Sequence, residues 1–216
     1  MTVTTTDLDN PYWEAVLNVE NQPAAYGMTG VNKLMLARHD LVDQYAWTIT
    51  DPATVAFVAE HAGPRVLDPL AGTGYWAHLL GQHGVDVHAS DLNPPGSDGN
   101  HWHRAGVTYA PIEADDAVDS TRAHGHNRTL LLSWPPYDNP LGWDIVHAYQ
   151  GDRIVYIGEG WGGCCGDDGM FRLFECDWVE VARHTPVQYM ACTISSPSTT
   201  AAEPPNPIPN HAKDQP

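Results

Sequence analysis

The chain has 216 residues, with 10 basic and 27 acidic side chains, which gives a net charge of −17 when histidine is neutral. This length suits one domain with a buried core plus a tail, because single domains commonly run to ~100–200 residues. A surface this acidic repels phosphate backbones, so binding of nucleic acid is disfavoured. No apolar run reaches the ~18–20 residues that cross a bilayer, and the first residues lack the basic and apolar regions of a signal peptide. We therefore expect a soluble, cytoplasmic protein without a membrane partner.

Helices and strands are expected to alternate along most of the chain. Apolar residues at near-helical spacing predict helices over 31–47 and 52–58, ahead of the first strand. β-rich runs bounded by turn residues then predict strands at 65–68, 86–91, 107–112, 129–133 and 153–157, with a closing antiparallel pair at 179–181 and 190–194. Between them, helices are predicted at 75–80, 144–149 and 167–176. The alternation predicts an α/β fold, a three-layer αβα sandwich around a doubly wound sheet.

The cysteines indicate the redox compartment of the protein, and the composition of the C-terminal segment indicates whether that segment folds. The cysteines are Cys164, Cys165, Cys176 and Cys192, too few for a disulfide scaffold or a four-thiolate zinc site, which fits a reducing compartment. Six prolines among small polar residues in 197–216 predict a disordered tail.

A glycine-containing turn, Pro69 to Gly74, joins the first strand to the next helix. Gly72 and Gly74 lack a Cβ atom and tolerate positive φ, so the backbone can turn tightly and approach a ligand. Asp91 stands 23 residues after Asp68, at the end of the next strand, where an acidic residue can bind both hydroxyls of a ribose. Ligands of doubly wound sheets bind outside the carboxyl ends of the strands. The combination predicts an adenosine-type cofactor, whereas the turn alone could be a tight connection without a ligand.

Two segments resemble motifs of a known family. Val66 to Gly74 and Leu132 to Tyr137 are similar to the first and fourth motifs of the class I S-adenosylmethionine-dependent methyltransferases. The resemblance covers roughly Trp47 to Ser196 and implies a seven-stranded, mostly parallel sheet that ends in an antiparallel hairpin, with S-adenosylmethionine as cofactor. We accordingly expect an N-terminal helical lid over 1–50, a Rossmann-like catalytic domain over 51–196 and the tail over 197–216.

The resemblance also implies how the cofactor is held. Asp68 and the Gly72–Gly74 backbone would face its methionine part, Asp91 the ribose, and either Asp115 or Asp116 the adenine amine. Leu70 replaces the first glycine of many members, as in the amino-methyltransferases whose turn begins Asp-Pro, so cofactor binding is expected to survive. The full set expected at the cofactor is Asp68, Leu70, Gly72, Gly74, Asp91, Leu92, Asp115, Asp116, Ser133 and Tyr45.

Trp134 departs from the pattern of the amino-methyltransferases of nucleic acid, which place Asp, Asn or Ser directly before Pro-Pro-Tyr. Tryptophan is a donor only and cannot accept a hydrogen bond from a target amine, unless Ser133 substitutes from one residue back. Adenine-N6 methylation is therefore disfavoured. Aromatic faces attract a sulfonium or an amine through the cation–π effect, so Trp134 and Tyr137 are candidate catalytic residues. Pro135, which lies between them in the same motif, is included with them.

Glu159 is the fourth candidate catalytic residue. It follows the fifth strand, where a carboxylate could bind a cationic substrate or act as a general base. A solvated acid at the end of the strand is the alternative. Cys164 and Cys165 have no identifiable partner base and stay outside the expected chemistry.

Aromatic and histidine residues outside these motifs have structural alternatives. Tyr45 and Trp47 would enter the mouth of the site if the N-terminal helices fold over the sheet, and Tyr12, Trp13 and Tyr26 could extend the lid, although core packing is the alternative for each ring. The pairs His101/His103 and His124/His126 have no third ligand at a fixed spacing, so no metal site is predicted. Trp102 and His103 could instead line the edge of the cofactor.

The leading hypothesis is a methyltransferase that acts on a nitrogen or oxygen nucleophile of a small molecule. A cyclase or lyase is an alternative, in which the cofactor's own amine or carboxylate attacks its aminobutyl carbon and methylthioadenosine leaves. An adenine-N6 nucleic-acid methyltransferase and a non-catalytic module that binds S-adenosylmethionine are further alternatives. The oligomeric state is left open.

Overall fold

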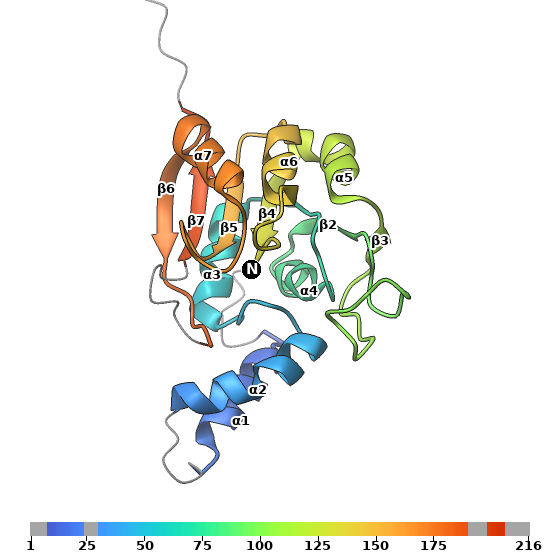
Figure 1. Ribbon diagram of the computed structural model, residues 1–216, viewed down its shortest axis with the longest axis vertical. Coiled ribbons are helices and arrows are strands. Elements are labelled where there is room, and N and C mark those ends of the chain that lie inside the picture. Colours follow the sequence, from blue (N-terminus) through green and yellow to red (C-terminus); the bar gives the residue numbers. More distant parts are fainter. Residues whose placement is uncertain (1–7, 24–29, 190–197, 206–216) are drawn as a thin grey trace, which may run out of the picture.

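A seven-stranded sheet with the order β3-β2-β1-β4-β5-β7-β6 forms the centre of the protein (Figure 1). The structure is a computed structural model that describes residues 8–23, 30–189 and 198–205. The strands are β1 (Arg65–Asp68), β2 (Asp86–Asp91), β3 (Glu113–Ala114), β4 (Thr129–Ser133), β5 (Ile154–Gly158), β6 (Val179–His184) and β7 (Ser198–Glu203). β7 runs antiparallel between β5 and β6, and the other pairs are parallel. The expected fold class, including its antiparallel closing pair, is confirmed.

Helices pack on both faces of this sheet. They are α1 (Pro11–Asn21), α2 (Gly30–Gln44), α3 (Pro52–Ala62), α4 (Tyr75–Gln82), α5 (Ala117–His124), α6 (Leu141–Ala148) and α7 (Asp168–Asp177), with a 3-10 turn at Gly125–Asn127. β4 contributes Leu131 to the core under α3 and α4, and Leu130 and Leu132 to the core under α5, α6 and α7. Successive side chains of a strand point to opposite faces, so this apolar strand is buried on both, as its sequence predicts.

The N-terminal helices belong to the core. Asn10 caps α1 by accepting from the Trp13 amide, and a proline starts the helix. Tyr12 and Val16 of α1, with Leu34 and Val42 of α2, pack in the same buried cluster as α3 and α4. Figure 1 shows α1 and α2 beyond the end of the sheet toward which β5 points. The sequence predicts two helices before β1, whereas the structure has three, because Pro11–Asn21 is also helical.

The C-terminal part of the sheet differs from its sequence prediction. The tail predicted from residue 197 is wrong at its start, because Ser198–Glu203 is β7 and pairs with both β5 and β6. Its serine, threonine and alanine side chains look like low complexity, but small and β-branched residues suit a strand with Thr199 and Ala201 fully buried. The strand predicted at 190–194 and residues 206–216 lie outside the described residues.

The third strand is also displaced from its prediction. Residues 107–112 form no strand, and β3 is the two-residue segment that follows, in register with Ser90 and Asp91. The 107–112 segment packs on the glycine turn instead, because the Tyr109 amide donates to the Thr73 carbonyl at 2.9 Å. Hydrogen bonding to the turn replaces pairing with a strand.

Among the described helices, none is long and apolar enough to cross a membrane.

Candidate functional site

The glycine turn after β1 is tied to the end of β2. Gly72 and Gly74 adopt φ values of 54° and 73°, the left-handed region in which glycine is favoured. The Gly72 amide donates to Asp91 Oδ2 at 3.0 Å, and the Asn93 amide donates to Asp91 Oδ1 at 2.9 Å. Asp91 therefore fixes the turn through one carboxylate oxygen and its own loop through the other. Each carboxylate oxygen has a further lone pair for a ligand hydroxyl.

Asp68 lies beneath this turn as a buried carboxylate with a free oxygen. Its side chain is 1% exposed, and Oδ1 has no hydrogen-bond partner. Burial, with a smaller contribution from the charge of Asp91, raises the pKa of Asp68 to about 7, although a hydrogen bond from the Leu70 backbone opposes the shift. A buried acid next to a second carboxylate is stabilised by a cationic ligand, because the ligand supplies the missing countercharge.

His103 covers the open side of the glycine turn. A Cβ atom on Gly72 would lie only 2.6 Å from Nε2 of His103, so only a glycine leaves room for this imidazole. His103 is 5% exposed, and its Nδ1 donates to the Val42 carbonyl at 2.8 Å. Burial lowers the pKa of His103, so the neutral ring presents a bare Nε2 toward the turn. The sequence indicates His103 only by its position after Asp91.

Residues 45–48 connect the N-terminal helices to the carboxyl ends of the strands. The Thr73 hydroxyl donates to the Tyr45 carbonyl. Thr48 Oγ1 and Ser133 Oγ are 2.9 Å apart, and the Trp76 indole lies 3.0 Å from the first and 3.1 Å from the second. Ser133 is thus engaged in a buried polar network. Sequence reasoning missed Thr48 and Trp76, because nothing in their spacing links them to β4.

The ring of Tyr45 belongs to an aromatic cluster. It stacks on Tyr12 at 4.9 Å between ring centroids and contacts Tyr75 and Tyr109 at 5.5 and 5.8 Å. Tyr12, Tyr45 and Tyr75 are buried in the core. The structure therefore uses these rings to attach the N-terminal helices, and Trp13 packs against the same cluster from its edge. Tyr26 lies outside the described residues.

The motif after β4 combines a strained backbone with an exposed ring. Trp134 adopts φ 56°, which is rare for a bulky residue and concentrates at functional sites, and its amide donates to the Ile157 carbonyl at 2.8 Å. Pro135 is buried, whereas Tyr137 is 66% exposed. Tyr137 borders a cavity of about 420 Å³, whose other lining residues include Asp138, Asp167, Asp168, Gly163 and Cys165. The lining residues found there include three aspartates and no lysine or arginine.

Glu159 is buried next to this cavity and bonded to the loop that follows β5. Its side chain is 3% exposed, and Oε2 accepts from the Cys164 amide at 2.5 Å. The Glu159 amide donates to Cys165 Sγ at 3.1 Å, and the Tyr156 hydroxyl donates to the Glu159 carbonyl at 2.6 Å. Burial raises the pKa of Cys165 to about 11, so this thiol stays protonated. These contacts give Glu159 a role in holding the loop that follows β5, and its burial does not fit the alternative of a solvated acid at the end of the strand.

The two aspartates expected near adenine differ in their surroundings. Asp116 caps α5, because its carboxylate accepts from the Val118 and Asp119 amides at 2.9 and 3.2 Å. Asp115 is half-buried, and its amide donates to the Asp91 carbonyl at 3.2 Å. Asp115 is therefore beside the ribose candidate, whereas Asp116 serves the helix. Leu92 is exposed, and Leu70 packs against the buried cluster under α5, α6 and α7.

Replacing each of these aspartates by alanine should separate the two roles. Asp116→Ala is expected to lower the free energy of unfolding by about 1 kcal/mol, as for other lost N-caps, and to leave nucleoside binding unchanged. Asp115→Ala is expected to weaken binding of S-adenosylmethionine about 10-fold, the value of one hydrogen bond to a charged group. Thermal melts and calorimetric titrations of both variants check this assignment, and the reverse pattern would exchange the two residues.

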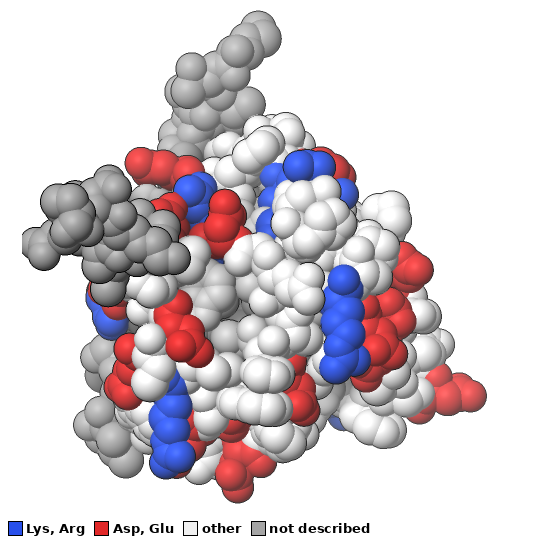
Figure 2. Space-filling view, turned by 90° about the horizontal axis from the view of Figure 1, so that it is seen from above, with Lys and Arg blue, Asp and Glu red and all other residues white. Residues whose placement is uncertain are grey.

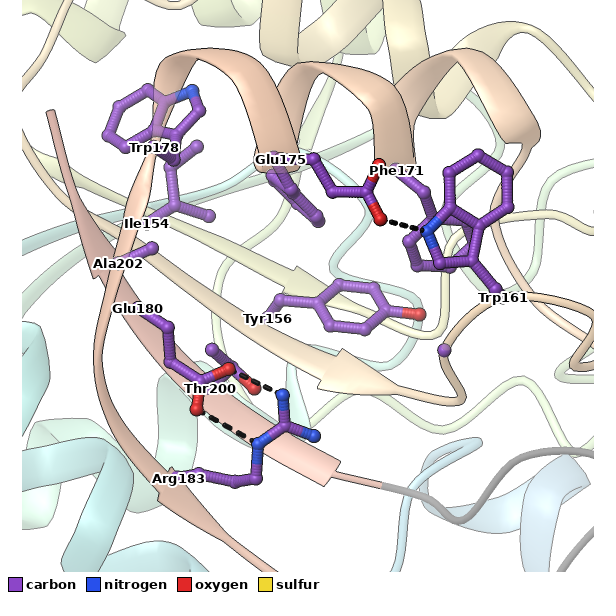
Figure 3. Close-up of a pocket in the computed structure, with 12 residues that line it drawn as sticks. Ile154, Tyr156, Trp161, Phe171, Glu175, Trp178, Glu180, Arg183, Thr200 and Ala202 are labelled. Carbon is purple, nitrogen blue, oxygen red and sulfur yellow. Dashed lines mark hydrogen bonds and ion pairs between the residues drawn. The ribbon is translucent and has the colours of Figure 1, made fainter. Parts of the chain in front are cut away.

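A second cavity lies between α7 and strands β5, β7 and β6, away from the glycine turn (Figure 3). It has a volume of about 330 Å³ and is lined mainly by aromatic and aliphatic side chains. At its rim Trp161 donates to Glu175 at 2.7 Å, and Arg183 pairs with Glu180. None of the site residues expected from the sequence lines this cavity.

The strand order and the turn decide the fold. Five strands are parallel, and the strand order runs outward in opposite directions from the neighbouring strands β1 and β4. The glycine turn follows β1, and the antiparallel strand β7 lies between β5 and β6. This is the Rossmann-like fold of the class I methyltransferases. The expectation drawn from the sequence motifs is therefore confirmed at the level of the fold.

Comparisons with solved structures find similar chains at low sequence identity. An S-adenosylmethionine-dependent O-methyltransferase of Thermotoga maritima is 14% identical with a TM-score of 0.45, over 81% of this chain and 70% of that one. TehB of Haemophilus influenzae is 14% identical with a TM-score of 0.46, over 77% and 67% of the two chains. A methyltransferase of Agrobacterium tumefaciens is 15% identical with a TM-score of 0.41, over 72% and 63%. No family model and no curated protein sequence matches the chain.

Proposed function

We propose that the protein is a methyltransferase that uses S-adenosylmethionine and acts on a nitrogen or oxygen nucleophile of a small molecule. The observation that carries the proposal is the buried Asp68 carboxylate, whose Oδ1 has no partner, beneath a glycine turn held by Asp91. A ligand that brings a cation to Asp68 and a diol to Asp91 satisfies both groups. S-adenosylmethionine carries an ammonium, a sulfonium and a ribose in one molecule.

The residues present fit this cofactor. A Cβ atom on Gly74 would lie 3.3 Å from Ala110 and Ile112, so the turn is closely packed from behind and leaves its backbone for the ligand side. Asp68 would hold the ammonium, Asp91 the ribose and Asp115 the adenine amine. When bound, the cofactor supplies an electrophilic methyl carbon. The protein would contribute orientation and exclusion of water, effects that together lower a barrier by ~7–11 kcal/mol in favourable cases.

The cavity beside Tyr137 suits a cationic or polar acceptor. Its aspartates, including Asp138 and Asp168, favour a positively charged group, and the exposed Tyr137 ring adds a cation–π surface. An amine acceptor entering there would lie at the carboxyl ends of β4 and β5, where ligands of this fold bind. These features support a small amine over an anionic substrate.

The charge distribution argues against nucleic acid as the acceptor. On the face seen in Figure 2, the basic side chains stand apart from one another, and most lie beside acidic ones. Several arginines are ion-paired: Arg104 with Asp43, Arg122 with Asp119, Arg128 with Asp86, Arg153 with Glu203 and Arg183 with Glu180. Paired arginines release few counterions from a phosphate backbone, so binding would be weak.

A cyclase or lyase that consumes S-adenosylmethionine is the second candidate. It is favoured by the position of residues 42–48, which bond to His103, Thr73 and Ser133 and so cover the carboxyl ends of the strands. A covered site leaves less room for a second substrate. In that reaction a carboxylate oxygen or amine nitrogen of the cofactor bonds to its aminobutyl carbon, the carbon–sulfur bond breaks, and methylthioadenosine leaves with the electron pair.

Incubation of the full chain with S-adenosylmethionine alone, followed by mass spectrometry, separates the two candidates. For the methyltransferase we expect the cofactor to stay intact and to turn over to S-adenosylhomocysteine only when an amine or hydroxyl acceptor is added. Methylthioadenosine above the enzyme-free rate would instead establish the cyclase or lyase. Absence of calorimetric binding would refute both, and binding without turnover across an acceptor panel would support a non-catalytic module.

Trp134 is expected to act on turnover more than on cofactor affinity. Trp134→Ala should lower kcat by about 10-fold, within the ~0.5–2 kcal/mol range of a cation–π contact, while the Kd for S-adenosylmethionine changes less. Trp134→Phe keeps an aromatic face and serves as the matched control. Steady-state kinetics and calorimetry check the split. Equal loss of turnover and affinity would make Trp134 a residue that packs against the cofactor.

A further inference from the structure

Three elements bring potential metal ligands together on the α5 side of the sheet (Figure 1). His88 lies on β2, Glu113 on β3, and His124 ends α5. One ligand atom from each side chain lies within 4.8 Å of the other two. The His88 and His124 rings are 3.9 Å apart between centroids, and His88 Nε2 is 3.6 Å from Glu113 Oε2. The cluster is distinct from Asp68 and Asp91.

The nitrogen of His88 that faces this cluster lacks a hydrogen-bond partner. Nε2 is shielded from solvent, and the 3.6 Å to the Glu113 carboxylate exceeds a hydrogen bond. A buried polar atom without a partner costs free energy that a ligand recovers. The Glu113 side chain is 59% exposed, so the cluster can be reached from solvent.

Charges around the cluster leave it suited to a cation. The positive charge of the nearby Arg128 guanidinium also acts on the His88 imidazole, but it is offset by an ion pair with Asp86 at 2.8 Å. The Asp115 carboxylate contributes further negative potential at the His88 imidazole. A cation bound by Glu113 therefore meets an acidic surrounding.

We propose that His88, Glu113 and His124 form a binding site for a divalent transition-metal ion of the Zn²⁺ class. Two imidazoles and one carboxylate are a common zinc ligand set, with water completing the coordination. Ligand atoms around tetrahedral zinc are ~3.4 Å apart, given metal–ligand distances of ~2.0–2.2 Å. Contraction from 4.8 Å to ~3.4 Å shortens the separation by about 1.4 Å, which side-chain rotation at the exposed Glu113 and half-buried His124 provides.

Such an ion would join β3 and the end of α5 to β2. The other end of α5 is already attached, because Ser120 bonds to Ser90 at 2.7 Å and Asp116 caps the first turn. The loop between β3 and α5 holds Asp115, so the metal would fix the segment on which this residue stands. The proposal itself does not depend on the proposed function.

The test is a calorimetric titration of the chelator-treated full chain with Zn²⁺. We expect one high-affinity ion per chain and a raised Tm, because an ion that binds only the folded state stabilises it. His124→Ala and Glu113→Gln, both at accessible positions, should each weaken binding at least ~100-fold, since even residues behind metal ligands cost 10–100-fold. His126→Ala and His101→Ala, exposed histidines of the two sequence pairs, should retain wild-type affinity.

Cobalt provides an independent readout. Co²⁺ bound at the proposed site should give a visible spectrum of nitrogen and oxygen ligation without sulfur-to-metal charge transfer, and Zn²⁺ should displace it. Unchanged Zn²⁺ affinity in His124→Ala and Glu113→Gln would overturn the proposal. Loss of binding in Cys164→Ser with a thiolate spectrum would also overturn it, by placing the ion at the cysteines.

Discussion

Replacing Asp68 by asparagine is expected to stabilise the ligand-free protein at pH 8 and to abolish its affinity for S-adenosylmethionine. The pKa of Asp68 is raised from 3.8 to about 7, mainly by burial, so the folded chain retains a proton that the unfolded chain loses near pH 4. Wild-type stability therefore falls as pH rises between about 4 and 7, by up to ~4 kcal/mol at 1.36 kcal/mol per pKa unit. Asparagine cannot ionise and avoids this loss.

Chemical denaturation at several pH values measures this effect. The difference in unfolding free energy between Asp68→Asn and wild type should grow from pH 4 to pH 8, and Asp98→Asn, at an exposed position, serves as the control variant. Calorimetry of S-adenosylmethionine should show binding only to wild type and the control. A pH-independent difference would mean that Asp68 is already ionised in the folded protein, and retained binding would remove it from the cofactor site.

Asp91→Ala is expected to weaken binding of S-adenosylmethionine by more than about 100-fold. The substitution removes two acceptors for ribose hydroxyls, each worth ~1.5–3 kcal/mol for a charged group. It also releases the Gly72 and Asn93 amides, which hold the turn and the loop in place. Both losses act on the same ligand surface, so the effect should exceed that of any other single carboxylate except Asp68.

Two further variants distinguish the ribose role from the structural one. Asp91→Asn keeps one acceptor oxygen and should retain part of the affinity, whereas Asp98→Ala removes an exposed carboxylate of the same loop and should have no effect. Adenosine competition read by calorimetry isolates the ribose contribution. If Asp91→Ala binds adenosine as tightly as wild type does, the carboxylate serves only to hold the turn.

The central part of the fold follows from local sequence patterns. β1, β2 and β4 lie where their sequences predict, because β-rich runs there are bounded by residues that favour turns and loops. β3 is displaced because it is only two residues long, Glu113 and Ala114, and both are exposed, so no hydrophobic pattern marks it. β7 consists mostly of small residues whose burial depends on pairing with β5, which local composition does not reveal.

The site residues on consecutive strands were also accessible to sequence reasoning, whereas contacts across the fold were not. The strand–turn–strand pattern brings Gly72 and Asp91 together, and the structure joins them by a hydrogen bond. The engagement of Ser133 by Thr48 and Trp76 depends on how the N-terminal helices pack. The His88, Glu113 and His124 cluster joins residues that are far apart in the chain, so no spacing rule detects it.

In the ligand-free protein, the imidazole of His103 occupies the space next to Gly72 and therefore competes with any ligand for it. A molecule that lies along the Gly72 backbone has to displace this ring and break its bond to the Val42 carbonyl. The apparent dissociation constant then equals the intrinsic one divided by the fraction of molecules in which the ring has moved aside.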